Sequence, residues 1–435
     1  MNDRCLFILS FHIALLLRHF DATEEQKPNS CGQSLILVSL DGFRWDYLKF
    51  NNSVLTPNLH FISKTGVEAK FVRSAFTTTT YPNHYTMVTG LYPETHGIVS
   101  NYMYDPKFKT RFDMKTTDPR WWKAEPLWIT NQKQGKISGV VYWPGYHVKI
   151  RGHLPLLSVD TPSANTDIGN TTGRIYSYKK RVDTVLRWLG RKRPPNFIAL
   201  YFEEPDESGH KFGPESTKLW EVIKMVDETI GYLVKRINDQ NLLECVNLIV
   251  TSDHGMTKIS SKRQIYLDKH VDPSSYDIWD ASTNFMINPH RGKLHYVYKS
   301  LKKVPHLNAY YTRDIPNTFH YKNNRRLTRI YAMPHLGWTI NTTKAHLRFS
   351  GNWEGGNHGF SNQEKDMHAL FVARGPAFKT GYKADAFDNI DLYSLLCRIL
   401  GVTPRPNNGT LQVTKCMLKP DFLSKSDKCM GVRGS

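Results

Sequence analysis

The sequence of 435 residues predicts an α/β fold with a mostly parallel central sheet, helices on both faces and a small inserted subdomain. Two observations predict the sheet and its helices: apolar runs of strand length recur along the chain, and amphipathic segments with helical spacing separate them. A third observation predicts the insertion, because polar residues interrupt shorter strand patterns over about residues 257–350. The length alone allows one large domain with an insertion or two to three domains.

The expected elements follow from local patterns. Strand candidates are residues 35–40, 197–202, 246–252 and 369–373. Helix candidates are residues 181–189 and 215–237, where apolar side chains recur with helical spacing and so predict one packed face. We expect a catalytic domain over residues 30–420 and a tail over 421–435.

The composition excludes a disordered tail, a collagen-like fibre and a small disulfide knot, because 40% of the residues are hydrophobic and only 28 are glycine. Lys and Arg number 58 against 39 Asp and Glu, which gives a formal charge of +19. This balance indicates a solvated basic surface or a positive field that attracts polyanionic substrates, acidic glycans or lipid headgroups. No nucleic-acid-binding module is recognisable in the sequence.

The first 22 residues have the pattern of a secretory signal peptide, with an apolar run over 5–17 that is too short to span a bilayer. An uncleaved anchor is the alternative, and a membrane anchor beyond residue 435 stays open. Export agrees with four glycosylation sequons, at Asn51, Asn170, Asn341 and Asn408. We therefore expect a secreted protein or one on the extracellular face of the plasma membrane.

Five cysteines remain after removal of the signal peptide, namely Cys31, Cys245, Cys397, Cys416 and Cys429. Their spacing is too wide for a metal knuckle. An oxidising exterior predicts two disulfides and one remaining thiol, with the pairing left open.

Acidic and imidazole side chains follow three of the strand candidates. Asp41 follows the first, Asp206 and His210 follow the second, and Asp253 and His254 follow the third. Because the carboxyl ends of parallel strands share one edge, we expect these groups to meet there. Taken singly, each Asp is also typical of a turn or helix cap, and each His of ordinary packing.

With His358, which lies in a Gly-Asn-His-Gly stretch, the set comprises three Asp and three His. Such ligands suit zinc, and one ion takes only three of them. Six ligands therefore predict two Zn²⁺ per chain.

The candidate nucleophile is Thr80, the last residue of a four-threonine run. Pro82 favours the start of a helix, which would place Thr80 at a helix N-terminus, where backbone N–H groups favour a phosphate. The alternative is that the threonine run forms an extended strand.

Several longer motifs resemble the ectonucleotide pyrophosphatase/phosphodiesterase family of the alkaline phosphatase superfamily, above all its short type 5 and type 4 members. The resemblance covers residues from about 33 to 420. The motifs are Asp41-Gly, Thr80-Tyr-Pro-Asn-His, Thr89-Gly-Leu-Tyr-Pro-Glu-Thr-His-Gly, Trp143-Pro-Gly, Glu204-Pro-Asp with Gly209-His, Ser252-Asp-His-Gly and Asn357-His-Gly.

The resemblance implies a role for each site residue. Asp41, Thr80, Asp253 and His254 would hold one zinc, and Asp206, His210 and His358 would hold the other. Asn101 would bind a non-bridging phosphate oxygen, while Tyr81, Trp143 and Pro144 would line the substrate pocket. Gly169 stands where many members carry a second stacking tyrosine, and Tyr176 or Tyr178 could replace it.

A threonine hydroxyl is a weak nucleophile, so coordination to zinc would be needed to activate it. We expect Thr80 to form a covalent diester that is then hydrolysed. The predicted activity is cleavage of nucleotide pyrophosphate or phosphodiester bonds in ATP, ADP, NAD or dinucleoside polyphosphates, with release of a nucleoside 5′-monophosphate. The alternatives are a choline-phosphodiester or lysophospholipid phosphodiesterase and a non-catalytic cell-surface binding protein. We expect a monomer whose partners are small phosphodiesters, not nucleic-acid duplexes.

Overall fold

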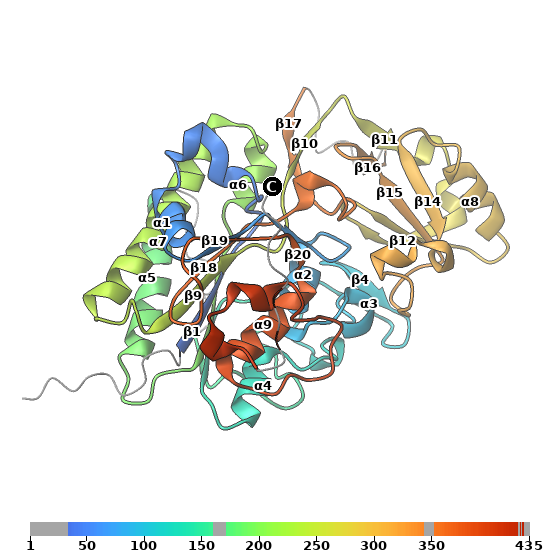
Figure 1. The fold of residues 1–435 in the computed structure, drawn as a ribbon. Helices are drawn as coiled ribbons and strands as arrows, with labels where there is room; N and C mark the ends of the chain where they lie inside the picture. Colours follow the sequence, from blue (N-terminus) through green and yellow to red (C-terminus); the bar gives the residue numbers. More distant parts are fainter. Residues whose placement is uncertain (1–33, 160–170, 343–351, 425–426, 428, 430–435) are drawn as a thin grey trace, which may run out of the picture.

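The computed structural model describes residues 34–159, 171–342, 352–424, 427 and 429. A twisted central sheet has helices on both faces, and a smaller lobe lies beside it (Figure 1). The sheet has eight strands in the order β19-β2-β18-β9-β1-β8-β6-β7. In that order the strands are Tyr382–Ala384, Val67–Ala69, Phe371–Arg374, Val246–Thr251, Ser34–Leu40, Phe197–Phe202, Ser138–Val141 and Leu157–Ser158.

Strand β1 is at the centre of the parallel part of the sheet. It pairs in parallel with β8 and β9, and β6 pairs in parallel with β8. Strand β18 is antiparallel to both β9 and β2. The predicted fold class, a mostly parallel sheet with helices on both faces, is confirmed.

Three of the four predicted strands have the expected bounds to within one residue. The fourth prediction, 369–373, is wrong by two residues at its start, because β18 begins at Phe371. The N–H of Ala369 donates instead to the carbonyl of Val72, outside the main sheet. The short strands β6 and β7 were not predicted.

The two faces of β1 explain why helices cover both sides of the sheet. Leu35 and Leu37 belong to one apolar cluster, whereas Ile36 and Val38 belong to a second cluster on the other face. Helices α2 (Thr80–Thr89), α4 (Leu127–Lys133) and α9 (Ile390–Leu400) contribute to the first cluster. Helices α1 (Pro57–Thr65), α5 (Thr171–Leu189) and α7 (Thr217–Asp239) contribute to the second.

The predicted helix 215–237 corresponds to α7, and the predicted helix 181–189 is only the C-terminal half of α5. The first ten residues of α5 lack a regular apolar stripe, so the pattern alone placed its start too late.

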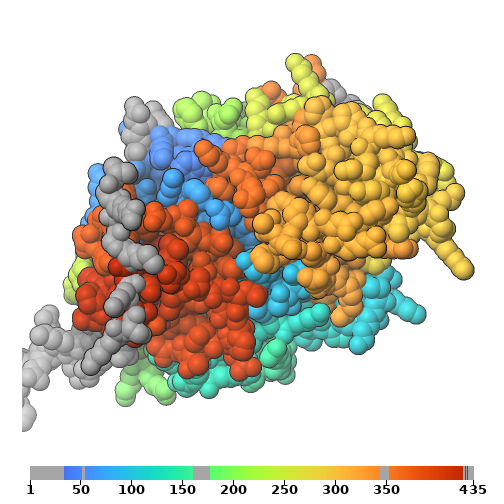
Figure 2. Space-filling model, turned by 45° about the vertical axis from the view of Figure 1, so that its right-hand side comes forward, coloured from blue at the N-terminus to red at the C-terminus, as the bar shows by residue number. Residues whose placement is uncertain are grey.

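The smaller lobe contains a four-stranded antiparallel sheet in the order β12-β13-β15-β14. These strands are Tyr276–Ala281, Phe285–Pro289, Ile330–Pro334 and Leu307–Tyr311, and helix α8 (Leu294–Leu301) packs against them. Figure 2 shows the lobe as yellow and light-orange surface on one side of the molecule. The smaller lobe lies within the stretch that was predicted to be an insertion. Its boundaries at residues 257 and 350 remain a prediction.

Three of the four predicted glycosylation sites lie in the described part of the chain. The signal peptide and Asn170 lie outside the described residues. Asn51 lies in the 3₁₀ helix Tyr47–Ser53, Asn341 ends β16 (Thr339–Asn341), and Asn408 is exposed in a loop. Among the described residues no helix has the length and apolar character needed to cross a membrane.

The prediction of two disulfides needs correction. Cys245 is disulfide-bonded, but Cys397, Cys416 and Cys429 are thiols. Cys397 is buried within α9, where it packs in the core. Three of the described cysteines are therefore free thiols, whereas only one free thiol was expected.

Candidate active site and metal centre

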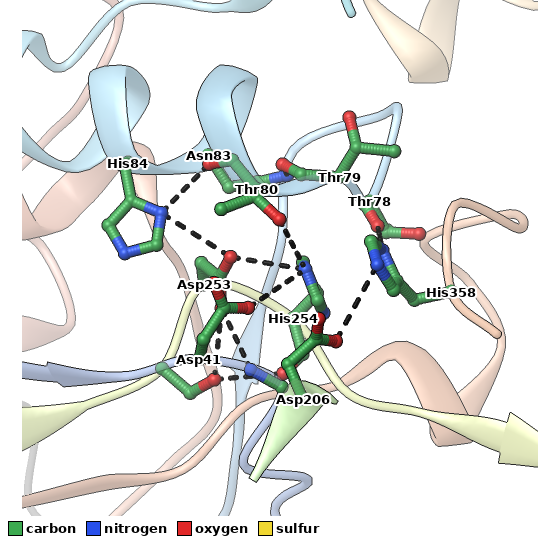
Figure 3. A network of polar contacts seen from close by, with 12 residues as sticks. Asp41, Thr78, Thr79, Thr80, Asn83, His84, Asp206, Asp253, His254 and His358 are labelled. Atoms are coloured by element: carbon green, nitrogen blue, oxygen red, sulfur yellow. Dashed lines mark hydrogen bonds and ion pairs between the residues drawn. The ribbon is translucent and has the colours of Figure 1, made fainter. Parts of the chain in front are cut away.

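The predicted ligands converge at one edge of the central sheet, and Figure 3 labels all of them except His210. Asp41 directly follows β1, and Asp253 and His254 follow β9. Asp206 begins α6 (Asp206–Phe212), shortly after β8. Because β1 is parallel to both β8 and β9, the three strands deliver these groups to the same side.

Asp41, Asp253 and His254 form the first cluster, in which the potential ligand atoms all lie within 4.8 Å of one another. Nε2 of His254 lies 3.4 Å from Oδ1 of Asp41 and 3.1 Å from Oδ2 of Asp253. Oγ1 of Thr80 is 3.4 Å from the same Nε2. The candidate nucleophile therefore lies at the first cluster.

Asp206, His210 and His358 form the second cluster, again with ligand atoms within 4.8 Å. Asp206 and His210 are four residues apart on α6, so they share one helix face. Nε2 of His210 lies 3.3 Å from Oδ2 of Asp206. Nε2 of His358 is 3.6 Å from Oδ1 of Asp206. The rings of His358 and His254 stack with centroids 3.6 Å apart, which brings the two clusters side by side.

Backbone carbonyls fix how the three histidines face the clusters. Nδ1 of His254, His210 and His358 lies 2.9–3.0 Å from the carbonyl oxygens of Gly255, Gly356 and Thr78, respectively. A carbonyl only accepts, so each Nδ1 carries the proton and donates it. In the neutral form of each histidine, Nε2 then has its lone pair toward the cluster, as metal-binding histidines require.

The ionisable groups of the two clusters shift one another's pKa values. Burial, together with Asp253 and Asp206, raises the pKa of Asp41 well above its ordinary value. Burial and the neighbouring His254 hold the pKa of His358 well below its usual range. Burial also lowers the pKa of His210, but the Asp206 carboxylate outweighs it and raises that pKa to about 9.

Three buried carboxylate oxygens accept no hydrogen bond: Oδ1 of Asp41, Oδ1 of Asp206 and Oδ2 of Asp253. Buried polar atoms are nearly always satisfied, so unsatisfied oxygens in both clusters point to an absent partner. Carboxylate oxygens and neutral imidazoles are the ligands of zinc and similar ions. The donor set therefore fits two divalent cations.

The start of helix α2 presents Thr80. The helix begins at Thr80, with Thr79 as its extended N-cap residue, so the prediction of a helix start at this position is confirmed. Asn83 fixes the preceding loop, because its Nδ2 donates to the carbonyls of Thr77 and Thr79, both at 2.9 Å. The alternative of one continuous extended threonine strand is excluded.

A cavity of about 620 Å³ lies over the two clusters and includes Thr80, Tyr81, Asn101 and Pro144 in its lining. Oδ1 of Asn101 accepts a 2.8 Å hydrogen bond from the backbone N–H of Tyr81. This bond occupies the amide oxygen and leaves the NH₂ group of Asn101 as a donor.

Two predicted pocket aromatics are not at the cavity. Trp143 is fully buried and donates through Nε1 to the carbonyl of His84, so the wall there is formed by Tyr142 and Pro144. Tyr178 is also fully buried, with its ring against Phe202, and does not replace the missing stacking tyrosine. The Tyr176 side chain lies outside the described part of the structure.

Two residues that contact the clusters, Tyr201 and His84, were not predicted as site residues from the sequence. The Tyr201 hydroxyl donates to Asp41 at 2.6 Å, and Nδ1 of His84 lies 3.3 Å from Asp253. His84 is four residues after Thr80 in α2, a spacing that would place both on one helix face. Tyr201 is one of several apolar or aromatic residues in β8, and nothing in its local pattern marks it.

The fold and these two clusters define the class of the protein: an α/β protein with two adjacent candidate metal sites at one edge of its central sheet. Residues 35–361 match the family model "Type I phosphodiesterase / nucleotide pyrophosphatase". The chain is 40% identical to human ectonucleotide pyrophosphatase/phosphodiesterase family member 5, with 93% of this chain and 81% of that protein covered. It is 42% identical to human bis(5'-adenosyl)-triphosphatase ENPP4, with 90% and 83% covered.

A solved structure of murine family member 5, an inactive variant in complex with AMP, superposes with a TM-score of 0.82 at 41% identity. The match covers 89% of this chain and the whole of the murine chain. The chain therefore belongs to the ectonucleotide pyrophosphatase/phosphodiesterase family, and it is a hydrolase of that type.

Proposed function

We propose that this protein is an extracellular, zinc-dependent enzyme that hydrolyses nucleotide pyrophosphate or phosphodiester bonds and releases a nucleoside 5′-monophosphate. ATP, ADP, NAD and dinucleoside polyphosphates are the candidate substrates. One observation carries the proposal: the Thr80 hydroxyl lies at a helix N-terminus, 3.4 Å from His254, beside two clusters of metal-ligand type.

The residues divide between two zinc ions. Asp41, Thr80, Asp253 and His254 would hold the first, and Asp206, His210 and His358 would hold the second. When bound, the ions would supply positive charge that favours the threonine alkoxide and stabilises the attacking and leaving oxygens at phosphorus.

The reaction then proceeds through two displacements at phosphorus. In the first, Oγ1 of Thr80 loses its proton to solvent and bonds to phosphorus while the bond to the leaving oxygen breaks, which gives a phosphothreonine diester. In the second, the oxygen of a water molecule bonds to phosphorus and the bond between phosphorus and Oγ1 breaks. Oγ1 takes up a proton from that water, and the nucleoside monophosphate leaves. The NH₂ group of Asn101 would donate to a non-bridging oxygen, and a neutral donor suits a diester that carries one negative charge.

Tyr81 is the residue of the cavity best placed to stack on a nucleobase. Its hydroxyl donates to the carbonyl of Met114 at 2.6 Å, which fixes the ring at the cavity wall. Stacking of a base on an aromatic ring contributes roughly 1–3 kcal/mol and tolerates different bases. The AMP complex of the murine relative and the name of the human triphosphatase support a nucleotide substrate.

An extracellular location is supported by the relatives that are named ectonucleotide enzymes. The four sequons and the predicted signal peptide agree with it. Secretion of the full-length chain from cultured cells, with the mature N-terminus determined by mass spectrometry, tests the location directly.

The activity is tested by product analysis of purified protein with ATP, ADP, NAD, diadenosine triphosphate and glycerophosphocholine. We expect AMP from the adenine nucleotides, and Thr80→Ala should reduce turnover by at least about 1000-fold because the covalent step is lost. Thr95→Ala, an exposed control outside the cavity, should match the wild type. Wild-type turnover by Thr80→Ala would exclude the mechanism, and turnover of glycerophosphocholine alone would favour a choline phosphodiesterase.

A further inference from the structure

A second cavity of about 610 Å³ adjoins the active-site cavity. The two cavities share four lining residues, Glu207, His210, Ser282 and Asn357. We propose that this second cavity is a leaving-group subsite, which binds the departing nucleoside phosphate when an extended nucleotide is cleaved. The inference rests on the proposed function and adds the part of the substrate that the first cavity does not hold.

The position of the second cavity follows the direction of an in-line displacement. In such a reaction the leaving group departs on the side of phosphorus opposite the nucleophile. Thr80 lies at the first ligand cluster, 3.4 Å from His254, so the opposite side is the second cluster. His210 belongs to that second cluster and lines both cavities. A leaving group that departs past His210 therefore enters the second cavity.

The apolar lining suits a nucleobase. Trp353 is half-buried and packs against a small apolar cluster that includes Ile259, and both residues line the cavity together with Ile340. A flat indole beside branched aliphatic side chains offers a surface on which a base can stack. The backbone ladder of β10 (Thr257–Ser260) and β17 (Glu354–Asn357) supports this wall.

The polar lining suits a ribose and its phosphate. Lys211 is exposed, follows His210 directly on α6 and provides a cation in the lining of the second cavity. The carboxylates of Glu207 and Glu354 can accept hydrogen bonds from ribose hydroxyls. Nζ of Lys258 lies 2.8 Å from Glu354, so this carboxylate is already compensated. Glu207 and Lys211 therefore share α6 with His210, whereas Trp353 belongs to the apolar lining. A nucleoside phosphate with its phosphate toward His210 and its base toward Trp353 matches this arrangement of polar and apolar side chains.

One predicted glycosylation site borders the same cavity. Asn341 lines the cavity, and its Nδ2 donates to Gln264 at 2.8 Å. A sugar attached to that nitrogen would stand at the cavity mouth and obstruct the subsite. All proteins in the test therefore carry Thr343→Ala, which removes the sequon and keeps Asn341.

The kinetic test compares two substrates that differ in their leaving group. Diadenosine triphosphate releases a nucleoside diphosphate, whereas the nitrophenyl ester of TMP releases only a small phenol. We expect Trp353→Leu and Lys211→Ala to lower kcat/KM for diadenosine triphosphate about tenfold more than for the nitrophenyl ester, mainly through KM. An equal fall for both substrates, or no fall, would overturn the proposal.

The structure offers a matched control for each variant. Nζ of Lys218 lies 5.2 Å from the centre of the Phe212 ring and Nζ of Lys211 lies 5.1 Å from it, but only Lys211 lines the cavity. Trp220 is half-buried on α7 and lines neither cavity. Lys218→Ala and Trp220→Leu should therefore leave both substrates at wild-type rates.

A binding measurement keeps the subsite testable if the proposed activity is wrong. In a Thr80→Ala background, which prevents turnover, ADP binding is measured by calorimetry in the presence of saturating AMP. We expect ADP to bind beside AMP, and Trp353→Leu to weaken that binding about tenfold. Absence of ADP binding, or equal binding with and without Trp353, would refute the subsite, whereas binding without any hydrolysis by the Thr80-containing enzyme would refute only the proposed function.

Discussion

The hydroxyl of Tyr201 donates a 2.6 Å hydrogen bond to Oδ2 of Asp41, and this bond orients the carboxylate. With Oδ2 held by Tyr201, Oδ1 of Asp41 lies 3.4 Å from His254 and accepts no hydrogen bond. Hydrogen bonds of this kind commonly fix metal ligands in proteins. Tyr201 therefore orients Asp41 so that its free Oδ1 faces the first cluster.

Removal of the hydroxyl in Tyr201→Phe should weaken zinc binding about 10- to 100-fold, because Asp41 is then free to rotate. Competition with a chromophoric chelator measures the affinity. Tyr232→Phe is the control, since its hydroxyl donates to Asp183 at 2.8 Å on a helix surface away from the clusters. Unchanged zinc affinity in Tyr201→Phe would show that Asp41 needs no such support.

The sequence was sufficient to predict the fold class and the residues that meet at the sheet edge. Asp41, Asp253 and Asp206 could be predicted because each follows an apolar strand, and parallel strands end at a common edge. The cavity wall could not be predicted in the same way. Trp143 and Tyr142 are neighbours in the sequence, yet the first is buried and the second lines the cavity. Which aromatic faces a ligand depends on packing between distant segments.

A buried ion pair joins the end of strand β4 (Met103–Asp105) to the segment that precedes β15 in the smaller lobe. Asp105 and Arg326 are both inaccessible, with Nε of Arg326 2.8 Å from Oδ2 of Asp105. Arg326→Met would leave a buried carboxylate with one partner fewer, and we expect a loss of about 3–5 kcal/mol in the free energy of unfolding. Denaturation in urea measures this loss in the free energy of unfolding. Arg313→Met, in an exposed pair with Asp314, should stay within about 0.5 kcal/mol of the wild type; an equal effect of both variants would contradict this assignment.

Burial raises the pKa of Asp280 to about 6, even though Ser100 and Ser282 donate hydrogen bonds to it. Its folded-state pKa thus exceeds its value of 3.8 in the unfolded chain. The contribution of this group to stability is fully present below about pH 4 and is lost as the pH rises through 6. The difference in unfolding free energy between wild type and Asp280→Asn should shift by about 2.5 kcal/mol from pH 4 to pH 7. A difference that is independent of pH would mean that burial does not raise the pKa of Asp280 above its value in the unfolded chain.

Metal binding at the second cluster should depend on pH through His210. The pKa of about 9 means that the metal-free protein carries a proton on His210 at neutral pH, which the ion must displace. Zinc affinity of this cluster should therefore fall about tenfold for each pH unit below 9. The measurement is a chelator titration of Asp41→Asn protein, in which the first cluster is weakened. The same titration with His210→Gln added should show a shallower dependence, and a flat profile before that change would exclude proton competition.

The central claim is that Asp41, Asp253 and His254 hold one zinc ion beside Thr80, and that Asp206, His210 and His358 hold a second. Anomalous diffraction on both sides of the zinc absorption edge, from crystals of protein purified without chelators, tests this claim most directly. We predict two zinc peaks, one within each cluster and both next to the Thr80 hydroxyl. Zinc peaks only elsewhere in the molecule, or a single peak that leaves one cluster empty at saturating zinc, would contradict the two-ion site.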